Sequence, residues 1–179
     1  MECLGRSLAK ARVPDGVVLD DNRRISAVGE GFTLAMNTLD HTRVTIAAQA
    51  LGIASGAYER ALAYSKQRKA FGKEIMHHQA IQFKLADMAT KIECARLLCL
   101  KSAWEKDNKI DYTLSGSMAK VFASETAMWT ATEAVQIHGG YGFVKEYHVE
   151  RMMRDAKITQ IYEGTSEVQR IVISRSILK

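Results

Sequence analysis

The chain has 179 residues, 47% of them hydrophobic and 25% charged, and its formal net charge at pH 7 is +5. This length and composition indicate one globular domain, or slightly more, with enough apolar side chains to bury a core. No apolar run approaches the ~18 residues of a membrane span, and the first residues do not resemble a signal peptide. Basic and acidic residues are interleaved, which argues against a nucleic-acid-binding tract, while a modest positive excess suits polyanionic ligands.

The residues up to about position 28 differ in character from the rest of the chain. Pro14 is the only proline, and Val13-Pro14-Asp15-Gly16 has the composition of a turn. We predict an irregular or poorly ordered segment over residues 1–28 and a domain over residues 29–179. Because proline interrupts helices, its absence after Pro14 predicts a chain built of long helices.

Three long helices are predicted from apolar residues that recur at steps of three and four. The first runs from about Gly31 to Lys66, with an apolar stripe formed by Ile46, Ala50, Ile53, Ala57, Ala61 and Tyr64. The second runs from about His78 to Glu105, with Ile81, Leu85, Met88, Ile92, Ala95 and Cys99 on one face. The third runs from about Tyr112 to His138, with a core side formed by Met118, Val121, Met128 and Val135.

A short helix near Tyr147–Met153 and a terminal helix from Ser166 are predicted to complete the chain, and no β-strand is expected. Gly72 is a plausible stop for the first helix. Ser166 and Gln169 have the spacing of a capping box at the start of the last one. The predicted fold class is therefore all-α, an up-and-down helical bundle.

Three cysteines are present, and none of Cys3, Cys94 and Cys99 belongs to a Cys-x-x-Cys pair. This usage predicts reduced thiols, as in a bacterial cytoplasm or a mitochondrial matrix, and argues against a zinc site. We therefore expect no metal ion.

The candidate functional stretch is Ile161-Tyr162-Glu163-Gly164-Thr165-Ser166-Glu167-Val168-Gln169-Arg170. Glu163 lies just before a predicted helix, next to a glycine that leaves room beside it. The free N–H groups of the following turn favour negative or polarised oxygen atoms. From these residues alone, a solvated glutamate without a function is the more common case.

Together with Met153-Arg154-Asp155-Ala156-Lys157-Ile158, this stretch resembles the C-terminal signature of the acyl-CoA dehydrogenases. Three earlier segments are similar to the short-chain, or butyryl-CoA, members of that family: Ala48-Gln49-Ala50-Leu51-Gly52-Ile53-Ala54, Ile81-Gln82-Phe83-Lys84-Leu85-Ala86-Asp87-Met88-Ala89 and Ala95-Arg96-Leu97-Leu98. The resemblance begins at about Val28 and covers the C-terminal helical domain of the family. It implies that residues 1–28 correspond to the end of a middle β domain, which this chain lacks together with the N-terminal helical domain.

The resemblance implies that Glu163 is the catalytic base, because the matching glutamate of the family removes the α-proton of an acyl-CoA. The backbone N–H of the same residue would bind the thioester carbonyl. Some relatives carry the base on the first helix instead, where this chain has Thr42, which cannot serve as a base. Arg154 and Asp155 are expected to pair in support of the loop that holds Glu163.

The resemblance also implies substrate-binding and cofactor-binding residues. On the acyl-CoA side, these are Asp40, Arg43, Tyr162 and Gly164, although Asp40 and Arg43 could equally form an ordinary helical ion pair. On the FAD side, they are Arg68, Phe71, Gln79, Gln136, Gly139, Gly140, Thr165 and Ser166. In the family, the first six reach the FAD of a neighbouring subunit. From sequence alone, the arginine and phenylalanine also fit an exposed turn, and the glycines fit a helix C-cap.

The whole protein implied by the resemblance uses FAD to oxidise a saturated acyl-CoA to the trans-2-enoyl-CoA. It would pass its electrons to electron-transfer flavoprotein and would form a homotetramer. The chain alone is expected to bind no flavin and to be inactive. The alternatives are an acyl-CoA oxidase, a dehydrogenase for branched or dicarboxylic acyl chains, and a non-catalytic helical interaction module.

Overall fold

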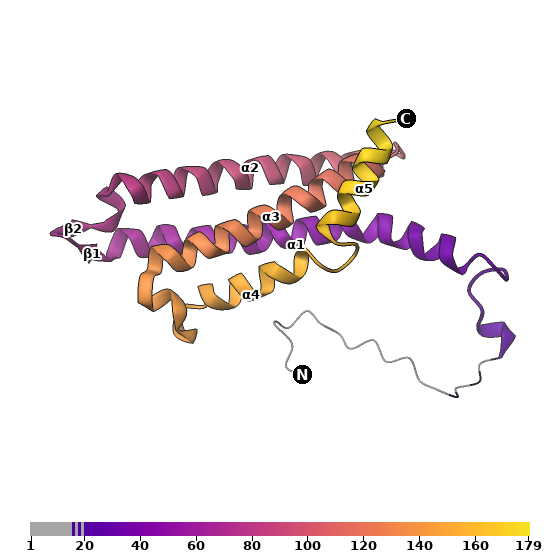
Figure 1. The fold of residues 1–179 in the computed structure, drawn as a ribbon, viewed down its shortest axis with the longest axis horizontal. Helices are drawn as coiled ribbons and strands as arrows, with labels where there is room; N and C mark the ends of the chain where they lie inside the picture. Colours follow the sequence, from indigo (N-terminus) through magenta and orange to yellow (C-terminus); the bar gives the residue numbers. More distant parts are fainter. Residues whose placement is uncertain (1–15, 17, 19) are drawn as a thin grey trace.

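A computed structural model describes residues 16, 18 and 20–179, in which five α-helices dominate (Figure 1). These are α1 (Gly31–Gln67), α2 (Gln79–Asp107), α3 (Thr113–His138), α4 (Val149–Thr159) and α5 (Ser166–Ile177). The first three run up and down beside one another, α4 lies along the α1–α3 pair, and α5 crosses one end. The all-α bundle predicted from the sequence is confirmed.

The segment before α1 has little regular structure among its described residues. A single short 3-10 helix, Asp21–Arg23, precedes α1, and the residues around it are exposed. The predicted turn at Val13-Pro14-Asp15 and the thiol of Cys3 lie outside the described residues. The other two cysteines are free thiols, Cys94 at the surface and Cys99 in the core, where burial raises the pKa of Cys99 to about 11.

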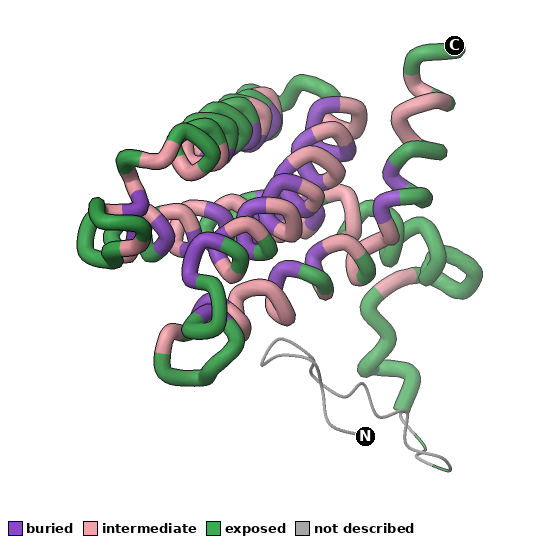
Figure 2. Tube along the Cα trace, turned by 60° about the vertical axis from the view of Figure 1, so that its left-hand side comes forward, coloured by how far each residue is buried: buried purple, intermediate pink, exposed green. Residues whose placement is uncertain are grey.

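Alanine dominates the contact between α1 and α3, which is the most extensive in the fold. We call this contact the alanine interface; its fully buried members are Ala47, Ala50, Ala54, Ala57 and Ala61 of α1 and Ala119, Ala123, Ala127, Ala131 and Ala134 of α3. Small side chains let two helix backbones approach closely, and Gly116 of α3 adds to this because a methyl group there would lie 3.3 Å from Val44. Figure 2 shows the resulting buried stripe along the helices that face the core.

The predicted core faces are partly right for all three long helices. On α2, Met88, Ile92, Ala95 and Cys99 are buried as predicted, while Ile81 and Leu85 are half-buried. On α1, the alanines of the predicted stripe are buried, while its larger members, Ile46, Ile53 and Tyr64, are half-buried. On α3, Met118, Val121, Met128 and Val135 are only half-buried, although Met128 and Val135 pack against the core, and the fully buried positions are mainly alanines. The close approach of α1 leaves no room there for larger side chains.

A six-residue β-hairpin lies between α1 and α2, so the prediction of no strand was wrong. Its strands are β1 (Lys69–Ala70) and β2 (Lys73–Glu74), with Lys69 opposite Glu74. Phe71 and Gly72 connect them with φ angles of +52° and +80°. Successive positive φ angles are typical of tight hairpin turns. Gly72 therefore forms the hairpin, and α1 ends earlier, at Gln67.

Two predicted details near the C-terminus also differ from the structure. The short helix is α4, which begins at Val149 and continues to Thr159. The N-cap of α5 is Thr165, whose hydroxyl accepts a hydrogen bond from the Val168 N–H at 3.3 Å, so Ser166 is not the capping residue.

None of the described helices is both long enough and apolar enough to cross a membrane. Within the described part of the chain, no group of three or more His, Cys, Asp or Glu residues is arranged to bind a metal ion.

The alanine interface predicts that a larger side chain is tolerated on one side of α1 only. Ala57→Leu should lower the free energy of unfolding by about 1–3 kcal/mol, because it overpacks a close helix contact. The control Ala63→Leu, on the exposed side of the same helix, should change it by less than ~0.5 kcal/mol. Urea denaturation followed by circular dichroism measures both. Equal effects of the two substitutions would contradict this packing.

Candidate active site

Glu163 lies in a strained turn between α4 and α5. Its φ angle is +57° and that of Gly164 is +85°, so two successive residues adopt the left-handed region. For a residue other than glycine, this conformation costs roughly 1–2 kcal/mol. The Ser166 N–H closes the turn on the carbonyl of Gln160 at 3.0 Å. Strain of this kind persists only where surrounding groups hold it in place.

Two buried side chains hold the turn from the inside. Gln169 donates from Nε2 to the carbonyls of Glu163 and Gly164, at 3.1 and 3.2 Å. Lys120 of α3, the largest fully buried side chain, donates from Nζ to the Gly164 carbonyl at 2.7 Å. A Cβ atom on Gly164 would lie 2.6 Å from Nε2 of Gln169, and the φ angle of +85° also disfavours other residues, so a larger residue here would strain the turn and displace the Gln169 amide.

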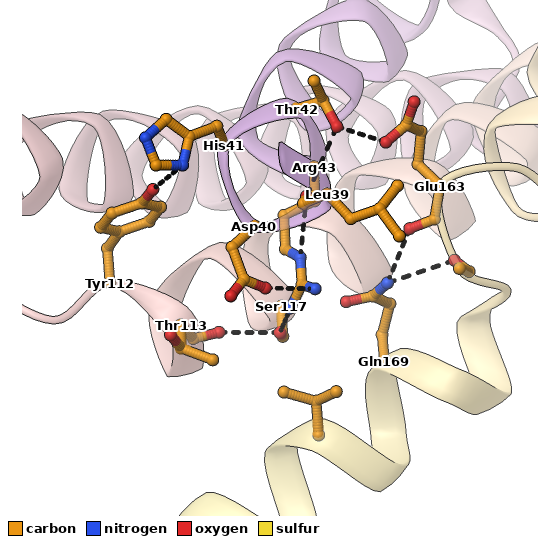
Figure 3. A network of polar contacts seen from close by, with 12 residues as sticks. Leu39, Asp40, His41, Thr42, Arg43, Tyr112, Thr113, Ser117, Glu163 and Gln169 are labelled. Carbon is orange, nitrogen blue, oxygen red and sulfur yellow. Dashed lines mark hydrogen bonds and ion pairs between the residues drawn. The ribbon is translucent and has the colours of Figure 1, made fainter. Parts of the chain in front are cut away.

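The side chain of Glu163 turns toward α1 and is half-buried there (Figure 3). The hydroxyl of Thr42 donates to its carboxylate. Beside it, the hydroxyl of Tyr162 donates to Oε1 of Gln49 at 2.6 Å. The turn is thus attached to α1 through two side-chain contacts, and Glu163 is not a freely solvated carboxylate.

Asp40 and Arg43 form an ion pair beneath this contact, with 2.5 Å between Nη2 and Oδ1. Arg43 is buried, and its Nη1 also donates to Oγ of Ser117 on α3 at 2.8 Å (Figure 3). Because its guanidinium is occupied by protein groups, Arg43 ties α1 to α3 at the level of the Glu163 turn.

Burial changes the ionisation of Lys120. It lowers the pKa of the ammonium group to about 8, an effect that the carboxylates of Glu163 and Glu167 oppose and that Arg43 reinforces. With a pKa of about 8, the side chain is mostly protonated at neutral pH and carries its charge directly beneath the turn. Burial also raises the pKa of Tyr162, the other titratable group next to Glu163.

A second site lies at the other end of the bundle. It is a groove of about 810 Å³ between the end of α1, the hairpin and the end of α3. The predicted residues Arg68, Phe71, Gln136, Gly139 and Gly140 all line it. The groove combines a cation, aromatic rings and two glycines whose Cβ positions face open space.

Aromatic side chains that the sequence prediction missed form one wall of this groove. The Arg68 guanidinium lies 5.5 Å from the ring centre of Tyr141. The Tyr64 ring stacks on that of His138 at 4.2 Å, and Nδ1 of His138 lies 2.7 Å from the Ala134 carbonyl oxygen. Burial lowers the pKa of His138, which keeps this stacked ring neutral.

The remaining predicted residues belong neither to the groove nor to the contact between Glu163 and α1. Gln79 is the exposed first residue of α2 and does not line the groove. Thr165 and Ser166 line a smaller cavity of about 150 Å³ beside Lys157. The Oγ of Ser166 is buried without a hydrogen-bond partner among the described residues. Arg154 pairs with Glu150 at 2.8 Å, so the expected pairing with Asp155 was wrong.

The sequence analysis also missed the contacts of Lys120 and Gln169. Lys120 follows the same three- and four-residue spacing as the buried alanines of α3, which is a detectable signal for a buried lysine. Its acceptor, Gly164, is 44 residues further along the chain. No local sequence pattern indicates that Lys120 and Gly164 are in contact.

The family model described as "Acyl-CoA dehydrogenase, C-terminal domain" matches residues 29–178. Among relatives, a probable acyl-CoA dehydrogenase, YngJ of Bacillus subtilis, is 51% identical over 96% of this chain and 44% of its own length. The CarC subunit of the caffeyl-CoA reductase-Etf complex of Acetobacterium woodii is 50% identical over 93% of this chain and 44% of its own.

Among solved structures, butyryl-CoA dehydrogenase from Megasphaera elsdenii matches with a TM-score of 0.83 and 54% identity. The match covers 84% of this chain and 39% of that one. The chain thus spans less than half the length of these proteins. The family match over residues 29–178, at about half identity to these relatives, is decisive: the chain belongs to the acyl-CoA dehydrogenase family and matches its C-terminal domain.

Proposed function

We propose that residues 29–179 are the C-terminal domain of an FAD-dependent acyl-CoA dehydrogenase acting on short-chain saturated acyl-CoA, and that residues 1–28 lead into it. The observation that carries this proposal is the half-buried carboxylate of Glu163, presented on a strained turn and held by groups from α1, α3 and α5. A structural glutamate would not need such support. The product is the trans-2-enoyl-CoA.

In this reaction, Glu163 takes the α-proton of the thioester as the β-hydrogen leaves with its electron pair, and the Cα–Cβ double bond forms. FAD, when bound, accepts that hydride. The α-proton is weakly acidic, so the base must be positioned over Cα and shielded from water, where desolvation increases its basicity. The hydroxyl of Thr42 orients the carboxylate in the absence of substrate. The backbone N–H of Glu163 is the proposed donor to the thioester carbonyl.

The proposed substrate-binding residues surround the same turn. Tyr162 and Gly164 flank Glu163 in the chain, and Tyr162 also contacts Gln49 of α1. Asp40 lies on α1 near Thr42, the partner of Glu163 (Figure 3). Arg43 is buried, so its part is to hold Asp40 and Ser117 in place.

The groove at the other end of the bundle fits the adenosine and diphosphate part of FAD. A guanidinium binds phosphate oxygens in pairs, exposed aromatic rings stack on adenine, and glycines allow close approach of the backbone. Arg68, Phe71, Gly139 and Gly140 supply these groups, with Gln136 beside them, and Gln79 is proposed to extend the contact from the start of α2. Thr165 and Ser166, whose Oγ lacks a partner among the described residues, are proposed as a separate contact near Glu163.

The two sites belong to different cofactors. Along α1, Thr42 and Arg68 are separated by 26 residues, or about 39 Å of helix, which is farther than one dinucleotide extends. Each chain would therefore supply Glu163 to one FAD and the groove to another, which supports a homotetramer with shared sites. Electron-transfer flavoprotein is the proposed electron acceptor, in line with the Etf complex named for the CarC relative. A bacterial cytoplasm or a mitochondrial matrix is the proposed location.

The base is tested in the protein completed by the N-terminal portion that its relatives carry. Glu163→Gln should slow anaerobic bleaching of the flavin by butyryl-CoA by about 10²–10⁴-fold, the usual contribution of a general base. Stopped-flow absorbance measures the rate. The control Glu93→Gln, an exposed glutamate on α2, should bleach as the unchanged protein does. Equal bleaching in the Glu163 variant would exclude this base, and rapid reoxidation by oxygen would indicate an oxidase instead.

The groove is tested by Arg68→Ala in the same completed protein. Loss of a charged hydrogen-bond donor to a phosphate should weaken FAD binding by about 10–100-fold. Recovery of flavin fluorescence on dilution measures the dissociation constant. Lys69→Ala is the matched control, because the adjacent lysine pairs with Glu74 across the hairpin and does not line the groove. If both variants hold FAD equally well, the groove is not its binding site.

A further inference from the structure

We propose that Lys120 is a positioning residue for the base: its buried ammonium group holds the Gly164 carbonyl and thereby keeps the Glu163 carboxylate aimed at the substrate. This inference rests on the proposed function. It concerns a residue on α3 whose side chain neither lines the groove nor carries an assigned role.

The first argument is geometric. Glu163 and Gly164 both adopt left-handed backbone conformations, which glutamate disfavours. Gln169, the other internal donor to this turn, comes from the adjoining helix only five and six residues later. Lys120 is the donor to its backbone that comes from the bundle core. It therefore fixes the turn relative to α1 and α3, and not merely relative to α5.

The second argument is the cost of placing a charge there. Lysine is almost never fully buried without a partner, yet Lys120 is completely covered. Its neighbours on the same face of α3 are alanines and small polar residues, so an apolar side chain would fit the core pattern. The carboxylates of Glu163 in the turn and Glu167 on α5 raise the pKa of Lys120 and so favour its charged form. The guanidinium of Arg43 on α1 lowers that pKa. A charge retained at this position is explained by the carbonyl that it holds.

The third argument concerns how Glu163 is held. Among the described residues, its side chain has one donor, the Thr42 hydroxyl, on α1 (Figure 3). A substrate that enters between α1 and the turn must displace or rearrange that contact. The backbone contacts of the turn then determine where the carboxylate points, and small displacements of a catalytic group can lower rates by about 10²-fold. Lys120 supplies the shortest of the side-chain contacts to the turn backbone.

The test uses three substitutions and one control. Lys120→Met keeps the length of the side chain but removes donor and charge, Lys120→Gln keeps an uncharged donor, and Lys120→Arg keeps both. The control Lys84→Met removes a lysine that pairs with Glu133 between α2 and α3, away from the turn.

The first measurement is amide hydrogen exchange in the 179-residue chain, which requires neither flavin nor activity. Lys120→Met should speed exchange at residues 162–166 at least tenfold and leave residues 84–100 of α2 within twofold. Lys84→Met should leave residues 162–166 unchanged. If exchange in Lys120→Met is faster by the same factor throughout the chain, Lys120 supports the whole bundle and the proposal is overturned. If exchange at the turn is unchanged, Lys120 does not hold the turn and the proposal is also overturned.

The second measurement is flavin bleaching by butyryl-CoA in the completed protein. Lys120→Met should lower the maximal rate by about 10–100-fold while the substrate concentration at half-maximal rate changes less than threefold. Lys120→Arg should recover most of that loss, and Lys120→Gln less. Unchanged bleaching in Lys120→Met, with Glu163→Gln inactive, refutes the positioning role alone. Normal bleaching in Glu163→Gln refutes the proposed base instead, and hydrogen exchange still decides whether Lys120 holds the turn.

Discussion

The close contact between α1 and α3 is the constraint on which the rest of the structure depends. Alanines on both helices allow it, and a larger side chain in this contact would separate the two backbones. One end of this pair carries Thr42 and Lys120, which meet the Glu163 turn. The other end carries Arg68 and Gln136, which line the groove. Both sites therefore inherit their geometry from one stretch of helix packing.

The Glu163 turn shows how a helical bundle can hold an unfavourable backbone conformation. Left-handed φ angles, a buried ammonium group and a buried glutamine amide are each costly alone. The carbonyls of the turn accept the hydrogen bonds that Lys120 and Gln169 donate, whereas Oε1 of Gln169 is buried without a partner among the described residues. Glycine is favoured at position 164 because the Gln169 amide occupies the space of a side chain. These energetically unfavourable features occur together at the Glu163 turn, as expected for a functional site within an otherwise regular fold.

The distance between the groove and the Glu163 turn bears on how several copies of the chain would assemble. If the groove and the turn bind FAD as proposed, α1 places them too far apart for a single dinucleotide to reach both. The proposed chain would then supply one half-site to each of two cofactors and would need partner chains, and Phe71 and Tyr141 are exposed at the groove. In this proposal, α1 and α3 set the distance between the two sites.

The sequence by itself determined the helices, because apolar spacing and the absence of proline after Pro14 are local signals: α1 was predicted at 31–66 and found at 31–67. It also singled out Glu163 and five of the residues that line the groove, although only through their resemblance to a family. Tertiary structure decided which face of α3 is buried, because alanine is too small to mark a core face until a second helix approaches. It likewise decided the pairing of Lys120 with Gly164, since a contact across 44 residues leaves no periodic trace in the chain.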